Sequence, residues 1–175
     1  MTVLETGAET DELFAEVYDR LKAMASRQRA RGAAQDTLST TEIVHELYLR
    51  MESAPAARFG DPAQFFAYAA RAMRHILIDT ARERMQLKSG GDLLRVSMTD
   101  PRVGAVEFDP AQAVQIDAAL RALEADDARA TRVVELHYFA GLPLDRIGEL
   151  LGIARRTVDR DWRFARAYLA AAVGN

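Results

Sequence analysis

Gly152 stands between two short amphipathic segments, and this pattern constrains the fold more than any other in the chain. The apolar residues before it fall at helical spacing and define one face about two turns long; they are Leu144, Ile147, Leu150 and Leu151. Glycine commonly ends a helix, because it takes a left-handed conformation without a steric penalty from Cβ. A second helix is expected from Arg155. Its apolar side chains share one narrow stripe at about 100° per residue: Val158, Trp162, Ala165 and Leu169. The sequence therefore predicts two helices joined by a tight turn.

The outer face of the second predicted helix is basic. Opposite the apolar stripe lie Arg156, Asp159, Arg160 and Arg163. A charged helical face is often simply solvated. However, an arginine-faced helix after a two-turn helix and a glycine turn is the arrangement that places a recognition helix in the major groove. Arginine side chains can reach guanine edges or phosphates there. The pattern indicates a DNA-binding helix-turn-helix.

Composition sets the broad class. The chain has 175 residues, of which 49% are hydrophobic, and this is enough for one ordinary domain or two small ones. It has no cysteine for a disulfide or a thiolate zinc site, and its three histidines are too dispersed for a metal site. No phosphate-binding loop or catalytic motif occurs. No catalytic residue, metal or cofactor is therefore expected.

The ends and apolar runs of the chain predict its compartment. No apolar run approaches the roughly 18 residues of a membrane span. The N-terminal segment is acidic and lacks the basic region and apolar core of a signal peptide. We therefore expect a cytoplasmic protein with no membrane partner.

The charge is unevenly distributed. A net charge of −3 is not the usual footprint of a general nucleic-acid binder. The basic residues gather in two stretches, 71–88 and 155–166, whereas the acidic residues concentrate at 5–19 and 100–127. Two basic patches separated by acidic segments predict two contacts with DNA, with the other surfaces kept for protein or left to repel DNA.

Hydrophobic periodicity along the chain predicts helices throughout. A capping box at Ser39–Glu42 starts one of them, and Pro62 starts the longest. The expected helices cover residues 10–29, 39–51, 62–87, 113–123 and 129–139, before the pair around Gly152. Glycines and prolines between residues 90 and 110 leave no lasting periodicity, and no β-strand is expected. The sequence thus predicts an all-α fold of two small bundles, residues 10–89 and 113–172, joined by a flexible linker over residues 90–112.

Three motifs, in this order, resemble the extracytoplasmic-function group of bacterial RNA polymerase sigma factors. EIVHELYLRM, residues 42–51, is similar to the helix of the second sigma region that holds the polymerase clamp. AMRHILIDTARER, residues 72–84, resembles the helix that reads and melts the minus-ten element. Residues 133–169 resemble the fourth region, whose second helix reads the minus-thirty-five element. The resemblance covers nearly the whole chain.

This resemblance implies a function and partners. The chain would be an alternative sigma factor that binds core RNA polymerase and directs initiation at particular promoters, with the two bundles as sigma regions 2 and 4. The implied partners are core RNA polymerase and promoter DNA, and an anti-sigma protein is a further candidate. No enzymatic activity is implied.

The resemblance also assigns roles to residues. The clamp-contacting positions match Glu42, His45 and Glu46, with histidine in place of the usual glutamine. The candidate minus-ten residues are Tyr68, Arg71, Arg74, His75, Asp79 and Arg82. The candidate residues for the upstream element are Arg155, Arg156, Asp159, Arg160 and Arg163. Ala154 stands where the family usually has a serine as the N-cap of the recognition helix, and losing such a cap costs about 1 kcal/mol.

Two other classes of protein share parts of this pattern. A sigma-like decoy that binds an anti-sigma protein and no promoter would be expected to lose the basic recognition face, which is present here. A plain helix-turn-helix regulator would not need the clamp-like helix. Binding to core RNA polymerase separates the three alternatives.

Overall fold

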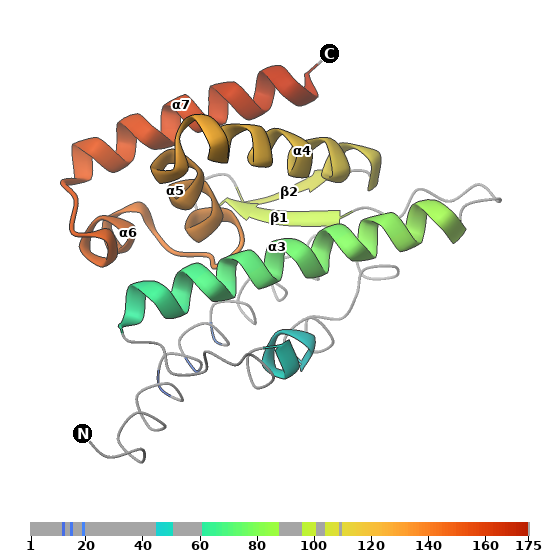
Figure 1. Ribbon diagram of the computed structural model, residues 1–175, viewed down its shortest axis with the longest axis horizontal. Helices are drawn as coiled ribbons and strands as arrows, with labels where there is room; N and C mark the ends of the chain where they lie inside the picture. Colours follow the sequence, from blue (N-terminus) through green and yellow to red (C-terminus); the bar gives the residue numbers. More distant parts are fainter. Residues whose placement is uncertain are drawn as a thin grey trace.

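The computed structural model describes residues 12, 15, 19, 45–50, 61–87, 96–100, 104–108 and 110–174 (Figure 1). Its elements, in chain order, are α3 (Pro62–Leu87), β1 (Val96–Asp100), β2 (Gly104–Phe108), α4 (Pro110–Asp126), α5 (Ala128–Tyr138), α6 (Leu144–Leu151) and α7 (Arg155–Val173). Residues 45–50 are also helical. The helical fold class is confirmed. Most of the expected helix 10–29, and the start of helix 39–51 with its capping box, lie outside the described residues.

The segment between the two expected bundles contains a β-hairpin. β1 and β2 pair antiparallel, from Val96 opposite Phe108 to Asp100 opposite Gly104. The expectation of a loop without strands was therefore wrong here. An isolated two-stranded hairpin is marginal in water, so a five-residue alternation such as VSMTD is a weak signal by itself. This hairpin is supported from outside, because β1 lies against α5 and β2 against α4.

Helix boundaries follow local capping chemistry. Pro62 occupies the first turn of α3, where its missing N–H costs nothing, and the Asp61 carboxylate accepts a hydrogen bond of 2.8 Å from the Gln64 amide. Asp127 separates α4 from α5 and accepts one of 2.9 Å from the Ala130 amide. The acidic stretch at residues 124–127 thus supplies a helix cap.

One hydrophobic cluster runs through both halves of the chain. Phe65 and Phe66 of α3 belong to the same buried cluster as Leu123 of α4, Leu136 of α5 and Ile147 of α6. α3 lies against α4, α5 and α6 (Figure 1). The helices assigned by sequence to two bundles therefore share a core, and this places the basic side of α3 against α4.

Candidate nucleic-acid interface

α6 and α7 form the helix-turn-helix expected from the sequence. Gly152 ends α6 in the left-handed conformation, with φ 63° and ψ 32°. The Gly152 amide donates to the Glu149 carbonyl at 3.2 Å, and the Ile153 amide donates to the Gly148 carbonyl at 3.0 Å, a Schellman pair. A Cβ on Gly148 would lie 3.1 Å from the Ile153 carbonyl oxygen. The two glycines therefore let the turn fold tightly onto α6.

The apolar stripe of α7 anchors this helix in the core. Val158 and Ala165 are fully buried and Trp162 is nearly so, while Leu169 is half-buried. The Trp162 ring lies edge-on to His137, with 4.4 Å between the ring centroids. The prediction that this stripe faces the core is confirmed. The opposite face of α7 is consequently held toward solvent.

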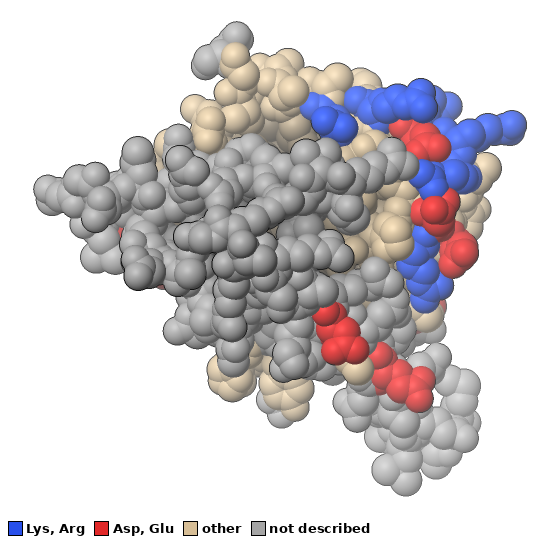
Figure 2. Space-filling view, turned by 180° about the vertical axis from the view of Figure 1, so that it is seen from behind, with Lys and Arg blue, Asp and Glu red and all other residues tan. Residues whose placement is uncertain are grey.

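Arginines dominate the exposed face of α7. Arg156 and Arg163 are exposed, and neither joins an ion pair within the part of the chain that the structure describes. The Arg160 side chain is 69% exposed although it lies 3.3 Å from Asp161. Figure 2 shows arginines gathered along one edge of the molecule, with a few carboxylates among them, where α6 and the first turns of α7 lie. These guanidinium groups are available to an external anion.

Arg155 and Asp159, which are candidate DNA contacts, form ion pairs within the chain, and their role in DNA binding stays a prediction. Arg155 contacts Asp145 of α6, and its Nη2 lies 3.2 Å from Asp159 Oδ1. The hydrogen bond to Asp145, followed by that to Asp159, raises the pKa of Arg155 above its usual value. Arg155 therefore links α6 to α7, and the charge of Asp159 is balanced by its ion pair with Arg155. The pairing with Asp145 joins residues ten apart across a turn, so the helical period of α7 alone did not reveal it.

A buried acid on α7 was missed by sequence reasoning. Asp161 is 3% exposed and accepts hydrogen bonds from Arg129 Nε at 2.6 Å and Nη2 at 3.2 Å. Burial raises the pKa of Asp161, but the hydrogen bond and charge of Arg129 outweigh it, so the net pKa is lowered. This pair joins α5 to α7. Nothing in the local pattern of either helix distinguishes these two charges from solvated ones.

Most of the candidate minus-ten residues form one exposed ridge on α3. At about 100° per residue, they fall within an arc of about 80°; they are Tyr68, Arg71, His75, Asp79 and Arg82. The three residues Arg71, His75 and Arg82 are exposed, whereas Tyr68 and Asp79 are partly buried. Burial, followed by the charge of Arg74, lowers the pKa of His75 below its usual value, which favours a neutral imidazole at pH 7.

Arg74 lies beside this ridge but faces inward. It is only 2% exposed, and its guanidinium is enclosed by Asp117 of α4 and Glu135 of α5. In this arrangement of the helices Arg74 is not accessible to DNA, and its role in minus-ten recognition stays a prediction. The reason for its burial is tertiary, because α4 covers the side of α3 from which Arg74 projects.

The candidate clamp helix is fixed to α3 at one end. Tyr68 Oη donates to the Arg50 carbonyl at 3.1 Å, and Arg50 Nη2 lies 3.6 Å from Asp79. His45 is exposed, while Glu46 is paired with Arg50 at 3.0 Å. Two large apolar side chains, Tyr48 and Leu49, are 46% and 44% exposed on the same helix. Glu42 lies outside the described residues.

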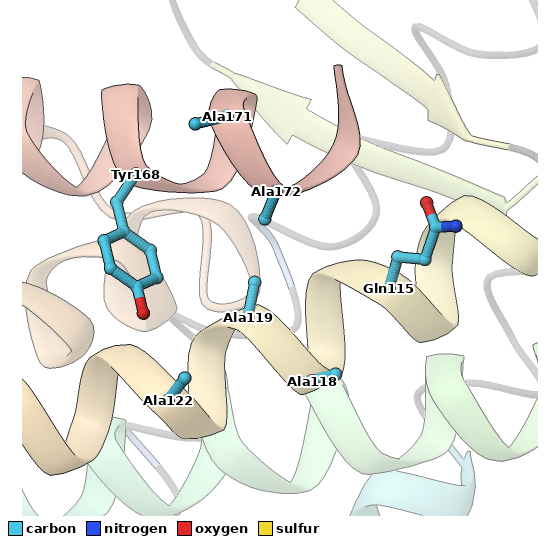
Figure 3. A pocket seen from close by; sticks show the side chains of 7 residues that line it. All are labelled: Gln115, Ala118, Ala119, Ala122, Tyr168, Ala171 and Ala172. Atoms are coloured by element: carbon cyan, nitrogen blue, oxygen red, sulfur yellow. The ribbon is translucent and has the colours of Figure 1, made fainter. Parts of the chain in front are cut away.

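Other features of the described residues do not suggest a second chemistry. Among them, no group of three or more His, Asp or Glu side chains could hold a metal ion. None of their helices has the length and apolar character needed to cross a membrane. A groove of about 580 Å³ separates α4 from α7 (Figure 3). It is lined by Gln115, Ala118, Ala119, Ala122, Tyr168, Ala171 and Ala172, and so presents no charge to a phosphate.

A helix-turn-helix with an arginine face, packed on a second helical unit with its own basic ridge, defines a class of DNA-binding transcription proteins. Within this class, the chain matches the family model described as ECF sigma factor over residues 5–175, and it belongs to that family. The family acts in transcription initiation with RNA polymerase and consists of transcription factors rather than enzymes. No curated protein and no solved structure matches the chain.

Proposed function

We propose that this chain is an alternative sigma factor that binds core RNA polymerase and directs initiation at a particular set of promoters. The observation that carries the proposal is the family match over residues 5–175, which spans both basic surfaces. In this proposal residues 10–89 serve as sigma region 2, residues 90–112 as the linker and residues 113–172 as sigma region 4.

The exposed face of α7 reads the upstream, minus-thirty-five element. Arg156, Arg160 and Arg163 supply guanidinium groups for base edges and phosphates. Their exposure supports this role, as does the burial of Trp162 behind them, which fixes the helix in one orientation. Arg155 and Asp159 contribute by holding α7 against α6 through Asp145.

The ridge on α3 reads and melts the minus-ten element. Its arginines meet phosphates, and Tyr68 offers an aromatic platform on which an unstacked base gains about 1 to 3 kcal/mol. His75 acts as a neutral hydrogen-bonding group, consistent with its lowered pKa. Asp79 orients the ridge through Arg82 and Arg50, which lie 3.4 and 3.6 Å from it.

The helix at residues 45–50 binds the polymerase clamp. His45 and Glu46 provide polar contacts, and Glu42 extends the same motif. The exposure of Tyr48 and Leu49 supports this role, because adjacent exposed apolar side chains on a helix are typical of interaction sites.

In vitro transcription with core RNA polymerase on genomic fragments tests the proposal. We expect discrete start sites that depend on the chain, and a complex with core enzyme by size-exclusion chromatography. Leu49→Asp places a charge on the exposed clamp face and should abolish the complex, whereas Gln86→Ala, at an exposed position on α3, should not. A wild-type chain that forms no complex with core enzyme contradicts the proposal. A complex that yields no transcripts contradicts the part of the proposal that concerns promoters.

A further inference from the structure

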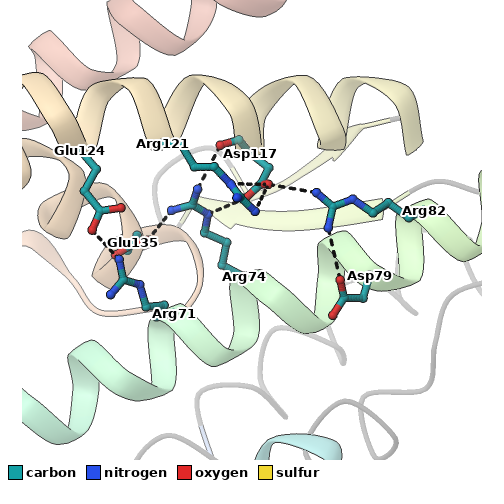
Figure 4. A network of polar contacts seen from close by, with 8 residues as sticks. All are labelled: Arg71, Arg74, Asp79, Arg82, Asp117, Arg121, Glu124 and Glu135. Carbon is teal, nitrogen blue, oxygen red and sulfur yellow. Dashed lines mark hydrogen bonds and ion pairs between the residues drawn. The ribbon is translucent and has the colours of Figure 1, made fainter.

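The basic side of α3 faces an acidic side of α4 and α5 (Figure 4). Each arginine among the candidate minus-ten residues, Arg71, Arg74 and Arg82, pairs with at least one carboxylate there. The carboxylates, here called the acidic trio, are Asp117, Glu124 and Glu135. All three arginines are thus paired, and the partners lie 35 to 61 positions apart in the sequence.

Arg74 makes the most extensive of these contacts. Its Nε donates to Asp117 Oδ1 at 2.9 Å, its Nη1 to Glu135 Oε1 at 2.7 Å, and its Nη2 to the Asp117 carbonyl at 3.0 Å. The side chains of Arg74 and Asp117 are each only 3% exposed. A guanidinium binds phosphate oxygens through the same fork of N–H donors. Members of the acidic trio therefore occupy the N–H donors of Arg74 that a phosphate would need.

The two outer arginines are held more loosely. The Arg71 and Arg82 side chains are 52% and 46% exposed, and exposed ion pairs exchange readily because they contribute little stability. Arg74 differs, because its buried guanidinium reaches an external anion only if α3 separates from α4. Arg121 Nη2 lies 3.0 Å from Asp117 and would keep this carboxylate paired after separation.

We propose that the acidic trio is an intramolecular competitor of promoter DNA, which occupies the α3 arginines in the free chain. The inference rests on the proposed function, since it takes α3 as the helix that meets the minus-ten element. In this closed arrangement His45 and the α7 arginines Arg156 and Arg163 stay exposed. The closed chain thus exposes the groups proposed to contact the polymerase and the upstream element, while Arg74 stays buried. Arg74 becomes accessible to DNA when α3 and α4 separate.

Neutralising the acidic trio tests the competition directly. The variant Asp117→Asn/Glu124→Gln/Glu135→Gln keeps the shape of each side chain and removes its charge. The probe is a pool of random-sequence single-stranded DNA, because phosphate contacts do not depend on sequence. We expect the variant to bind the DNA pool more tightly than the wild-type chain. The slope of log K against log salt concentration should be steeper by about 2, because each of the three released arginines would displace about 0.7 counterions from single-stranded DNA. Circular dichroism verifies that the variant stays helical.

A matched control separates competition from net charge. The variant Glu12→Gln/Asp19→Asn/Asp126→Asn removes three negative charges at exposed positions outside the acidic trio. It should leave the affinity for the DNA pool and its salt slope nearly unchanged. An equal gain in the control, or no gain on neutralising the trio, would overturn the proposal.

A covalent cross-link between α3 and α4 tests whether the closed chain can initiate transcription. The chain contains no cysteine, so Arg71→Cys/Glu124→Cys introduces a single pair at half-exposed positions that face each other. A short bifunctional maleimide should link the two within one chain. The reference is the same variant capped at both cysteines with a monofunctional maleimide, so that the loss of Arg71 is common to both.

The cross-linked chain should bind core RNA polymerase as the capped chain does, but should fail to open promoters. Failure of the maleimide to link the pair, when each single-cysteine variant is labelled, contradicts the closed arrangement. Equal promoter opening by the cross-linked and capped chains overturns the proposal. If the wild-type chain neither binds core enzyme nor initiates, the proposed function fails instead, and the comparison on the DNA pool still decides whether the acidic trio competes with DNA.

Discussion

At the scale of single residues, exposure divides the arginines of α7 into two kinds. Arg155 forms ion pairs with Asp145 and Asp159, whereas Arg156 and Arg163 are exposed to solvent. Residues near the start of a recognition helix usually reach base edges, and later ones meet phosphates. The position along α7 therefore predicts different roles for two chemically identical side chains.

We expect Arg156→Ala to relax base preference at one position of the upstream element, at a cost of roughly 1 to 3 kcal/mol. Arg163→Ala should instead weaken binding about equally across sequences and lower the salt slope by about one counterion. Selection of randomised upstream elements, with a salt titration of each variant, measures both effects. The division of roles is wrong if Arg156→Ala keeps the base preference or Arg163→Ala changes it.

A second residue-scale prediction concerns Asp161. Its pKa in the folded chain is lowered, so its charged form contributes stability above the ordinary aspartate pKa of about 3.9, and this contribution is lost as pH falls through the lowered value. Arg129→Ala removes the main cause of the lowering while the carboxylate stays buried. We therefore expect the acid-unfolding midpoint to move to higher pH. Arg132→Ala, an exposed position on the same helix, is the matched control and should leave the midpoint in place.

At the scale of elements, the turn between α6 and α7 contains two positions at which substitutions should have opposite effects on the free energy of unfolding. Gly152 has a positive φ, and no atom lies within 4 Å of an added Cβ, so Gly152→Ala should cost about 1 to 2 kcal/mol through backbone strain alone. Ala154 is the N-cap of α7, with φ −63° and ψ 143°, and makes no side-chain cap bond. Ala154→Ser should therefore stabilise the fold by about 1 kcal/mol. Urea denaturation measures both changes, and shifts of the same sign would contradict this account of the turn.

At the scale of the whole molecule, the shared core predicts that α3 and α7 unfold together. Trp162, the single tryptophan of the chain, lies on α7, and Phe65 lies on α3 within the same buried cluster. We expect Phe65→Ala to destabilise the chain by about 3 to 5 kcal/mol and to lower the unfolding midpoint seen by Trp162 fluorescence. Gln86→Ala should not move that midpoint. Two separate transitions, one by circular dichroism and another by fluorescence, would show that the halves unfold independently.

The sequence by itself determined those features that depend on neighbours a few residues apart. The start of α3 at Pro62, the bounds of α6, the left-handed turn at Gly152 and the burial of Trp162 follow from helical period and backbone stereochemistry. The order of the three motifs identified the family, as the match over residues 5–175 confirms. The roles of the candidate site residues stay predictions.

Tertiary structure alone decided which charges are free. Arg74 and Arg156 have the same side chain, yet one is enclosed by Asp117 and Glu135 and the other is exposed. The difference arises because α4 covers one side of α3, a contact between residues more than forty positions apart that leaves no period in either helix. The pairing of β1 with β2 has the same origin, since these strands need the surfaces of α4 and α5. Local sequence sets where helices begin and end, whereas burial of a charge depends on which distant helix happens to cover it.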